Sequence, residues 1–215
     1  MKEDSLAYKA YTEIRKKLLA NQLLPGIRLK EDAWSKQLGI NRMAIREALT
    51  RLLGEQLLLR GEKGGFFVRS FSPKDIQEIK ELREILETGA IKLIIQYNRE
   101  MEVVPKLREI CDDYSNMISK GYYSGACEAD IKFHETIILE AGNIKLKEIY
   151  TASNIPLFHQ KIGQAQTDPN DYEITEAEHI SLVNAIEKSD FELAKDILFK
   201  HFARGESLVL DMIQA

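Results

Sequence analysis

Residues 25–69 decide the fold of the first part of the chain, and they read PGIRLKEDAWSKQLGINRMAIREALTRLLGEQLLLRGEKGGFFVR. A short amphipathic segment, Glu31–Leu38, is followed by a glycine turn and by Asn41, whose side chain suits the N-cap of a helix. In that second helix, apolar residues recur at spacings of three and four, which predicts one buried face: Ile45, Ala48, Leu49 and Leu52. The segment therefore predicts two short helices joined by a tight turn.

A neighbouring face of the second helix is expected to be exposed. Two apolar runs follow, at 57–60 and 66–69, and the glycine-rich loop 61–65 between them predicts a β-hairpin wing. Two helices, a short turn, arginines on the second helix and a wing are typical of a DNA-reading winged helix-turn-helix. The alternative is a winged helix that binds protein and keeps its arginines in solvent. The candidate DNA contacts are Arg42, Met43, Arg46, Thr50, Lys63, Gly64 and Gly65.

Three motifs in this segment resemble the DNA-binding domain of GntR-type transcriptional regulators: PGIRLKE at 25–31, LGINRMAIREALTRL at 38–52 and GGFFV at 64–68. The resemblance covers about the first third of the chain. It implies that Arg42 and Arg46 contact operator DNA and that a glycine at the wing tip enters the minor groove.

Composition and charge are those of an ordinary globular protein of 215 residues, with 44% hydrophobic and 30% charged residues. The sequence has no apolar run of membrane-spanning length, no signal-peptide pattern and only two cysteines, so we expect a cytoplasmic protein. Residues 1–70 hold 14 basic and 8 acidic residues, a charge of +6, whereas residues 71–215 hold 16 and 26, a charge of −10. A basic first part suits contact with phosphate, and an acidic remainder does not.

The remainder of the chain reads as helices only. Ser72 suits an N-cap and Pro73 the first position of a helix, so we place a domain boundary here, with domains at 1–70 and 71–215. The predicted fold is mainly α: a winged helix-turn-helix followed by an all-α bundle, with Pro156 expected to kink the fourth bundle helix. The expected helices are Pro73–Asn98, Val103–Lys120, Tyr122–Ala141, Ile144–Gln166, Asp171–Lys188 and Asp190–Ile213.

Three histidines lie on apolar helical faces of this second part, namely His134, His179 and His201. A single histidine in such a place is usually a core residue with one satisfied hydrogen bond. Asp130, however, precedes His134 by four residues, so the two side chains point to one place beside their helix, as a metal ion requires. The spacing does not decide whether the three helices converge.

Arg83 also lies on the apolar stripe of its helix. A buried arginine needs an anionic partner, because an unpaired charge in the interior is very costly. Its planar fork matches a carboxylate through two hydrogen bonds. The partner is either an internal glutamate or aspartate, or the carboxylate of a bound small molecule.

The second part resembles the FCD effector-binding domains of the FadR-like subfamily, and six helices place it in the shorter, VanR-like branch. The motifs are ELREILE at 81–87, DIKFH at 130–134 and EHISLVNAIEKSD at 178–190, with His201 in the last helix. The resemblance implies that a divalent ion binds to Asp130, His134, His179 and His201. It also implies that Arg83 binds an effector carboxylate, and we add Asn154 and His159 as further effector-binding candidates.

Three imidazoles and one carboxylate suit a transition-metal ion, so Zn²⁺, Ni²⁺, Fe²⁺ and Mn²⁺ are all candidates. Together these features predict a transcription regulator, a repressor, whose affinity for double-stranded operator DNA is controlled by a small organic acid at a metal-containing pocket. A homodimer is expected, because one recognition helix makes too few contacts for a specific genomic site.

Two other functions stay open at this point. One is a regulator that senses the metal ion itself, and the other is a hydrolase whose metal activates water. No further residue stands out as a general base beside the four ligands, so we predict that the chain is not an enzyme.

Overall fold

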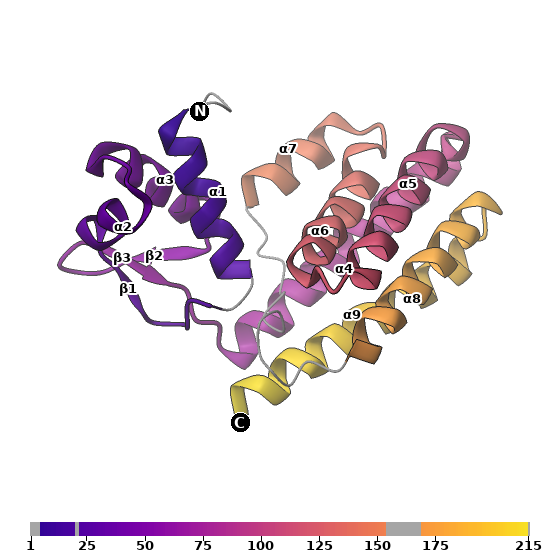
Figure 1. The fold of residues 1–215 in the computed structure, drawn as a ribbon. Coiled ribbons are helices and arrows are strands. Elements are labelled where there is room, and N and C mark those ends of the chain that lie inside the picture. Colours follow the sequence, from indigo (N-terminus) through magenta and orange to yellow (C-terminus); the bar gives the residue numbers. More distant parts are fainter. Residues whose placement is uncertain (1–4, 20–21, 154–168, 215) are drawn as a thin grey trace. The chain divides into compact units, whose positions relative to one another are not determined.

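The computed structural model describes residues 5–19, 22–153 and 169–214 (Figure 1). Within them the chain divides between Phe71 and Ser72 into two compact units, and each unit is described by itself. The fold class predicted from the sequence is confirmed: the structure is mainly α-helical, with one small sheet in the first unit.

The first unit is a winged helix-turn-helix with a three-stranded antiparallel sheet in the order β1-β3-β2. Its elements are α1 (Leu6–Leu19), β1 (Arg28–Leu29), α2 (Glu31–Leu38), α3 (Arg42–Gly54), β2 (Leu58–Arg60) and β3 (Phe66–Val68). The sequence predicted the hairpin of β2 and β3 but not β1. That strand has only two residues, and its pairing with β3 is defined by partners far along the chain, such as Arg28 opposite Phe67.

Local sequence sets the turn before α3 and the residue at which α3 begins. Gly39 adopts a left-handed conformation with φ of 66° and ends α2, as the tight turn requires. The Asn41 side chain then accepts a hydrogen bond from the backbone N–H of Ala44 at 3.0 Å and caps α3. The buried face of α3 packs on α1, and the predicted core residues Ile45, Ala48, Leu49 and Leu52 are all fully buried.

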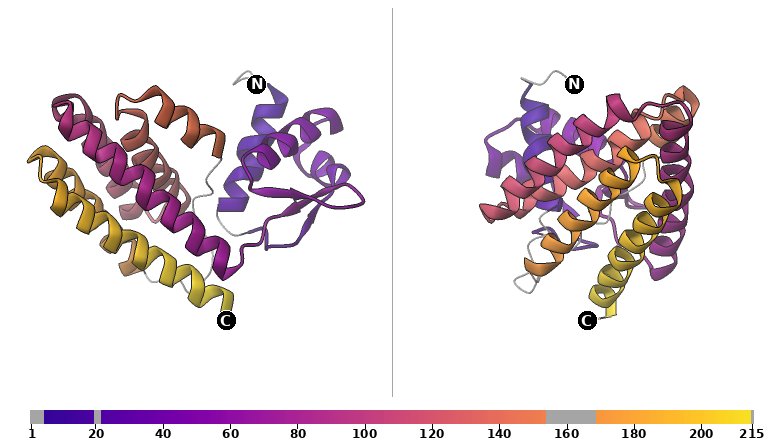
Figure 2. Two further views of the ribbon diagram at one scale, coloured as in Figure 1. Left: turned by 180° about the vertical axis from the view of Figure 1, so that it is seen from behind. Right: turned by 90° about the vertical axis from the view of Figure 1, so that its right-hand side faces the viewer.

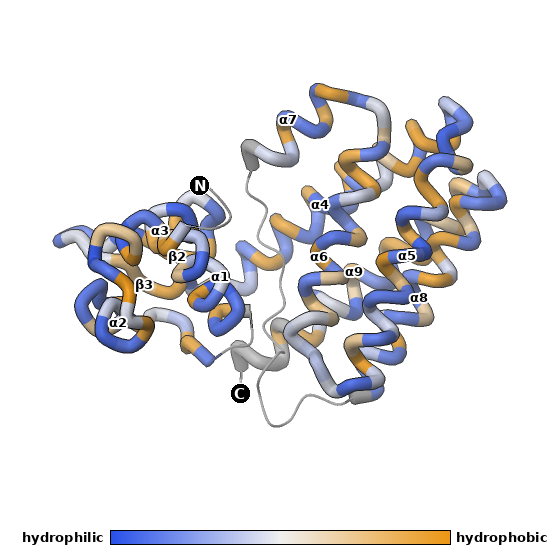
Figure 3. The backbone as a smooth tube through the Cα atoms, turned by 45° about the horizontal axis from the view of Figure 1, so that its top comes forward, coloured by the Kyte–Doolittle hydropathy of each residue, from blue (hydrophilic) through white to orange (hydrophobic). Residues whose placement is uncertain are grey.

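The second unit contains six helices within the described residues: α4 (Pro73–Gln96), α5 (Glu100–Ser119), α6 (Tyr123–Leu139), α7 (Ile144–Ser153), α8 (Pro169–Glu187) and α9 (Phe191–Gln214). Five of them pack in a closed ring in which α4 contacts α6, α6 contacts α5, α5 contacts α8, α8 contacts α9 and α9 returns to α4. The pairing of α4 with α9 is visible from behind (Figure 2). Hydrophobic and hydrophilic stretches alternate along these helices, as amphipathic packing requires (Figure 3).

The ends of the bundle helices mostly follow the predicted signals. Ser72 and Asp75 form a capping box, with Pro73 in the first turn of α4. Helix α5 begins at Glu100, three residues before the expected start, because the chain completes its turn at Asn98, where φ is 51°. Helix α7 is described as far as Ser153, so the rest of the predicted fourth helix and its kink at Pro156 lie outside the described residues. None of the described helices is long and apolar enough to cross a membrane.

Candidate metal centre and DNA-reading face

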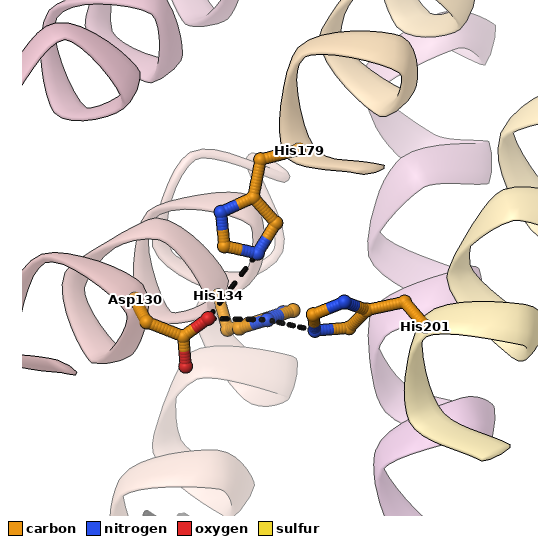
Figure 4. A group of neighbouring side chains, drawn as sticks. All are labelled: Asp130, His134, His179 and His201. Atoms are coloured by element: carbon orange, nitrogen blue, oxygen red, sulfur yellow. Dashed lines mark hydrogen bonds and ion pairs between the residues drawn. The ribbon is translucent and has the colours of Figure 1, made fainter. Parts of the chain in front are cut away.

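The ring of helices brings four polar side chains to one place in the second unit (Figure 4). Helix α6 contributes Asp130 and His134, one turn apart, whereas α8 contributes His179 and α9 contributes His201. Asp130, His134 and His179 are buried, and the His201 side chain keeps 12% of its surface exposed. The helices therefore converge, which the sequence spacing had left undecided.

The donor atoms of these four residues face one another. The Asp130 Oδ1 atom lies 3.2 Å from His179 Nε2 and 3.8 Å from His134 Nε2, and the Nε2 atoms of His134 and His201 are 3.2 Å apart. One ligand atom from each residue lies within 4.8 Å of the others. Three nitrogens and one oxygen at these separations are compatible with a single transition-metal ion.

Two carboxylates on the outer side of the cluster set the orientation of two imidazoles. Glu87 on α4 lies with Oε2 2.6 Å from His134 Nδ1, and Glu178 on α8 lies with Oε2 2.7 Å from His201 Nδ1. Because an ionised carboxylate only accepts hydrogen bonds, each Nδ1 carries the proton and donates it. The neutral imidazole is then left with a bare Nε2 that faces the centre, which is the tautomer that a metal ligand needs.

The pKa shifts support this assignment of charges. Burial lowers the pKa of His134 to about 4, so the ring is neutral near pH 7. Burial works to raise the pKa of Glu178, but hydrogen bonds from His201 and Arg204 outweigh it and lower that pKa to about 2. For Glu87, likewise, burial is outweighed by His134 and Arg83, and its pKa is lowered. Both carboxylates are therefore ionised.

The centre of the cluster is short of hydrogen-bond donors. With both Nδ1 atoms protonated, the Nε2 atoms of His134 and His201 are two acceptors 3.2 Å apart. Two acceptors at that separation repel each other unless a cation, either a proton or a metal ion, lies between them. The buried Nε2 atom of His179 faces Asp130 Oδ1 at 3.2 Å, and the His179 ring stacks on Phe133 with centroids 4.0 Å apart. The donor set therefore fits a divalent ion.

Arg83 lies behind Glu87 and is 9% exposed. Its Nε atom donates to Glu87 Oε1 at 3.0 Å, and its guanidinium carbon lies 4.2 Å from the centroid of the Phe202 ring. The internal partner that the sequence allowed is thus present, but it engages only one side of the fork. The buried Nη2 atom of Arg83 has no hydrogen-bond partner in the part of the chain that the structure describes.

No role was predicted from the sequence for Glu87, Glu178 or Arg204. Arg204 donates two hydrogen bonds to Glu178, at 3.0 and 2.6 Å, as Arg83 donates to Glu87. One local signal was available for the first pair, because Glu87 follows Arg83 by four residues on the same helical face. Glu178 and Arg204 are on different helices, and only the packing of α8 on α9 brings them together.

The candidate DNA contacts of the first unit all lie at its surface or in the wing. Arg42, Met43, Arg46 and Thr50 are on the exposed face of α3, and Met43 is 71% exposed. Lys63 is exposed in the loop between β2 and β3. Gly64 and Gly65 have φ of 82° and 94°, so they occupy a conformation that favours glycine. The effector candidates Asn154 and His159 lie outside the described residues.

Each of the two units matches a known protein family. Residues 6–68 match the gntR family of bacterial regulatory proteins, and residues 78–204 match the FCD domain. The chain is 28% identical over 197 residues to the HTH-type transcriptional regulator YdhC of Bacillus subtilis, covering 89% of this chain and 85% of that protein. It is 24% identical to the gluconate operon transcriptional repressor of Bacillus licheniformis, and the match covers 97% of this chain and 86% of that protein.

The fold is also that of a solved structure. The chain is similar to McbR/YncC of Escherichia coli, with a TM-score of 0.77 and 20% identity over 97% of this chain and 99% of that one. At this identity the likeness concerns the fold alone.

We predict that the buried pair of Arg83 and Glu87 is required for stability of the helical unit. Glu87→Ala should lower the free energy of unfolding by about 3–5 kcal/mol, because it leaves a buried guanidinium without its carboxylate. Glu87→Gln keeps the volume and one acceptor and should cost less. Urea denaturation in the presence of a chelator, followed by circular dichroism, measures both.

The matched control is Glu148→Ala, which removes an exposed glutamate paired with Lys145 on α7. An exposed pair of this kind is worth at most about 1 kcal/mol. If Glu87→Ala costs no more than the control, the buried pair does not hold the unit together.

Proposed function

This chain belongs to the GntR family of bacterial regulatory proteins and carries an FCD domain, and we propose that a small organic acid sets its affinity for operator DNA. The family makes it a DNA-binding transcription regulator and not an enzyme. In the proposal, residues 1–70 read the operator, and residues 71–215 hold a divalent ion on Asp130, His134, His179 and His201. The effector is a carboxylic acid held between that ion and Arg83.

The observation that carries the proposal is the set of three imidazole nitrogens that converge on one buried carboxylate oxygen. His134, His179 and His201 direct Nε2 towards one carboxylate oxygen in a buried place, and two of these nitrogens face each other at 3.2 Å. Core histidines satisfy their ring nitrogens with hydrogen bonds. A bound divalent ion would be a Lewis acid that accepts these lone pairs and has room for an oxygen of a small acid.

Arg83 supports the carboxylate part of the proposal. Its buried Nη2 atom lacks a partner within the described residues, although a guanidinium group can hold a carboxylate through two parallel hydrogen bonds. Glu87 separates Arg83 from His134, through contacts of 3.0 and 2.6 Å, so the arginine lies close behind one proposed ligand. One relative is named a gluconate operon transcriptional repressor, and gluconate is a hydroxy acid. That name is also why we propose repression.

A dimer that reads an inverted repeat is the form in which we expect the protein to bind DNA. Helix-turn-helix dimers place two recognition helices in successive turns of the major groove. Binding of the acid would favour one packing of the helical units and thereby change the spacing of the two DNA-reading heads. The finer placement in the VanR-like branch is part of this proposal and rests on the six described helices.

For the DNA contacts, we expect Arg46→Ala to cost about 1–3 kcal/mol of operator affinity, as for the loss of a bidentate contact to guanine. The probe is a duplex that the protein selects from a random-sequence library, titrated at fixed salt. Lys9→Ala removes an exposed charge from α1 and serves as the control. Unchanged affinity in the Arg42→Ala, Arg46→Ala double variant would show that α3 does not read DNA in this way.

For the metal, we expect one ion per chain in the purified protein and much less in His179→Ala. The melting temperature should fall with the metal content, because an ion that binds only the folded chain stabilises it. Elemental analysis and calorimetry measure the two quantities, and Asp113→Asn on the exposed side of α5 is the control. Equal metal content in wild type and His179→Ala would make these histidines ordinary core residues.

For the effector, calorimetry with hydroxy-, keto- and dicarboxylic acids should find one that binds the wild-type protein and loses affinity in Arg83→Ala and after metal removal. Arg108→Ala, which removes a half-exposed arginine paired with Glu187, should leave its affinity unchanged. A coupling of about 1–3 kcal/mol would change operator affinity roughly 5–150-fold. If an acid binds with the same affinity with and without Arg83 and with and without the metal, the proposed pocket is wrong. If the metal ion alone changes operator affinity, the protein is a metal sensor.

A further inference from the structure

Two ion pairs join the first turn of α2 to the recognition helix α3. Arg46 donates through Nε to Glu31 Oε1 at 3.0 Å and through Nη2 to Glu31 Oε2 at 2.9 Å. One turn earlier on α3, the Nε atom of Arg42 lies 2.7 Å from Asp32 Oδ1. Both arginines that are candidates for reading bases are thus held by carboxylates of the preceding helix.

The two pairs differ in burial and in geometry. The Glu31 side chain is 18% exposed and engages Arg46 through two hydrogen bonds, which sets the plane of the guanidinium group. Arg42 and Asp32 are 61% and 62% exposed and are joined through one nitrogen and one oxygen. A largely exposed single contact of that kind is weak, because water and salt screen it and both side chains lose rotamer freedom. The first pair is therefore able to orient its arginine, and the second is not.

The bond to Glu31 leaves the reading edge of Arg46 available. A guanidinium group has five N–H donors in a rigid fork. Glu31 uses the edge formed by Nε and Nη2, so the end formed by Nη1 and the outer Nη2 proton stays available for two further acceptors. The O6 and N7 atoms of guanine present such a pair of acceptors in the major groove. Glu31 would thus direct the arginine without blocking it.

Asp32 acts on DNA affinity through its charge and not through the orientation of an arginine. Its carboxylate adds a negative charge to the exposed surface that carries Arg42 and offsets the positive charge of that arginine. Sequence-independent affinity for duplex DNA comes largely from lysines and arginines that neutralise phosphates. A carboxylate at this position therefore lowers affinity for any sequence.

We propose that Glu31 is a positioning residue that sets the base specificity of Arg46, whereas Asp32 lowers the affinity of the DNA-reading face for all duplexes alike. The proposal rests on the proposed role of α3 in reading DNA. The positioning role requires an ionised Glu31, and the hydrogen bonds from Arg46 lower the pKa of Glu31 accordingly.

The test uses the full-length protein and two duplexes of equal length and composition, one selected by the protein from a random library and one scrambled. Glu31→Gln should lower the ratio of selected to scrambled affinity at least about fivefold, the lower end of what a bidentate base contact discriminates. Asp32→Asn should raise both affinities and leave the ratio unchanged. Its plot of log affinity against log salt should steepen by about 0.9, the value for one further phosphate contact.

A double-mutant cycle separates orientation of Arg46 from a general effect on folding. In an Arg46→Ala background, Glu31→Gln should not change the affinity ratio any further, because no arginine remains to be oriented. Glu13→Gln removes an exposed acid from α1 and should leave the ratio unchanged. Unchanged affinity for scrambled DNA and an unchanged melting temperature show that Glu31→Gln is folded.

The outcomes distinguish this inference from the function on which it rests. If Arg46→Ala lowers operator affinity but Glu31→Gln leaves the ratio intact, the positioning role of Glu31 is wrong and α3 still reads DNA. A drop in the ratio that persists in the Arg46→Ala background also overturns it. If Arg46→Ala itself changes nothing, both the inference and the proposed DNA contact fail.

Discussion

The hydrogen bond between Glu87 and His134 is the interaction on which the centre of the helical unit depends. A carboxylate with no exposed surface is tolerated only when cationic and hydrogen-bonding partners replace water. Arg83 supplies the charge and His134 supplies the N–H donor, at 3.0 and 2.6 Å. The same bond connects α4 to α6 and turns the bare Nε2 of His134 inwards. The hydrogen bond that satisfies the buried charge of Glu87 thus also orients His134 Nε2 as a ligand atom of the candidate metal centre.

A second set of residues repeats this arrangement. Arg204 and Glu178 hold His201 as Arg83 and Glu87 hold His134, so two arginine–carboxylate–imidazole chains reach the cluster, one through α4 and α6 and one through α8 and α9. Within the described residues the carboxylates of both chains are hydrogen-bonded, whereas Nη2 of Arg83 and the inner Nε2 atoms of the two imidazoles face no donor–acceptor partner of the right kind. A site whose surroundings are hydrogen-bonded and whose inner nitrogens are bare is arranged for a bound cation rather than for packing alone.

The two units use charge in opposite environments. In the helical unit the side chains of Arg83 and Arg204 are largely buried and paired with Glu87 and Glu178, so removal of one partner is costly. In the DNA-reading unit Arg42 and Arg46 are more than half exposed, and water screens their pairs with Asp32 and Glu31. The exposed pairs therefore contribute little to stability. We therefore assign these pairs to DNA binding rather than to the fold: Glu31 to base specificity and Asp32 to overall affinity.

The sequence by itself determined the features that depend on neighbours along the chain. The apolar period of α3, the cap at Asn41 and the capping signal at Ser72 are local, and the structure has each of them. Asp130 and His134 could be paired because four residues are one helical turn. The strand β1, the convergence of His179 and His201 on that pair, the contact of Glu87 with His134 and the partners of Glu178 were decided only by tertiary structure. Each depends on which helices or strands pack together, and no spacing within one segment records the position of another.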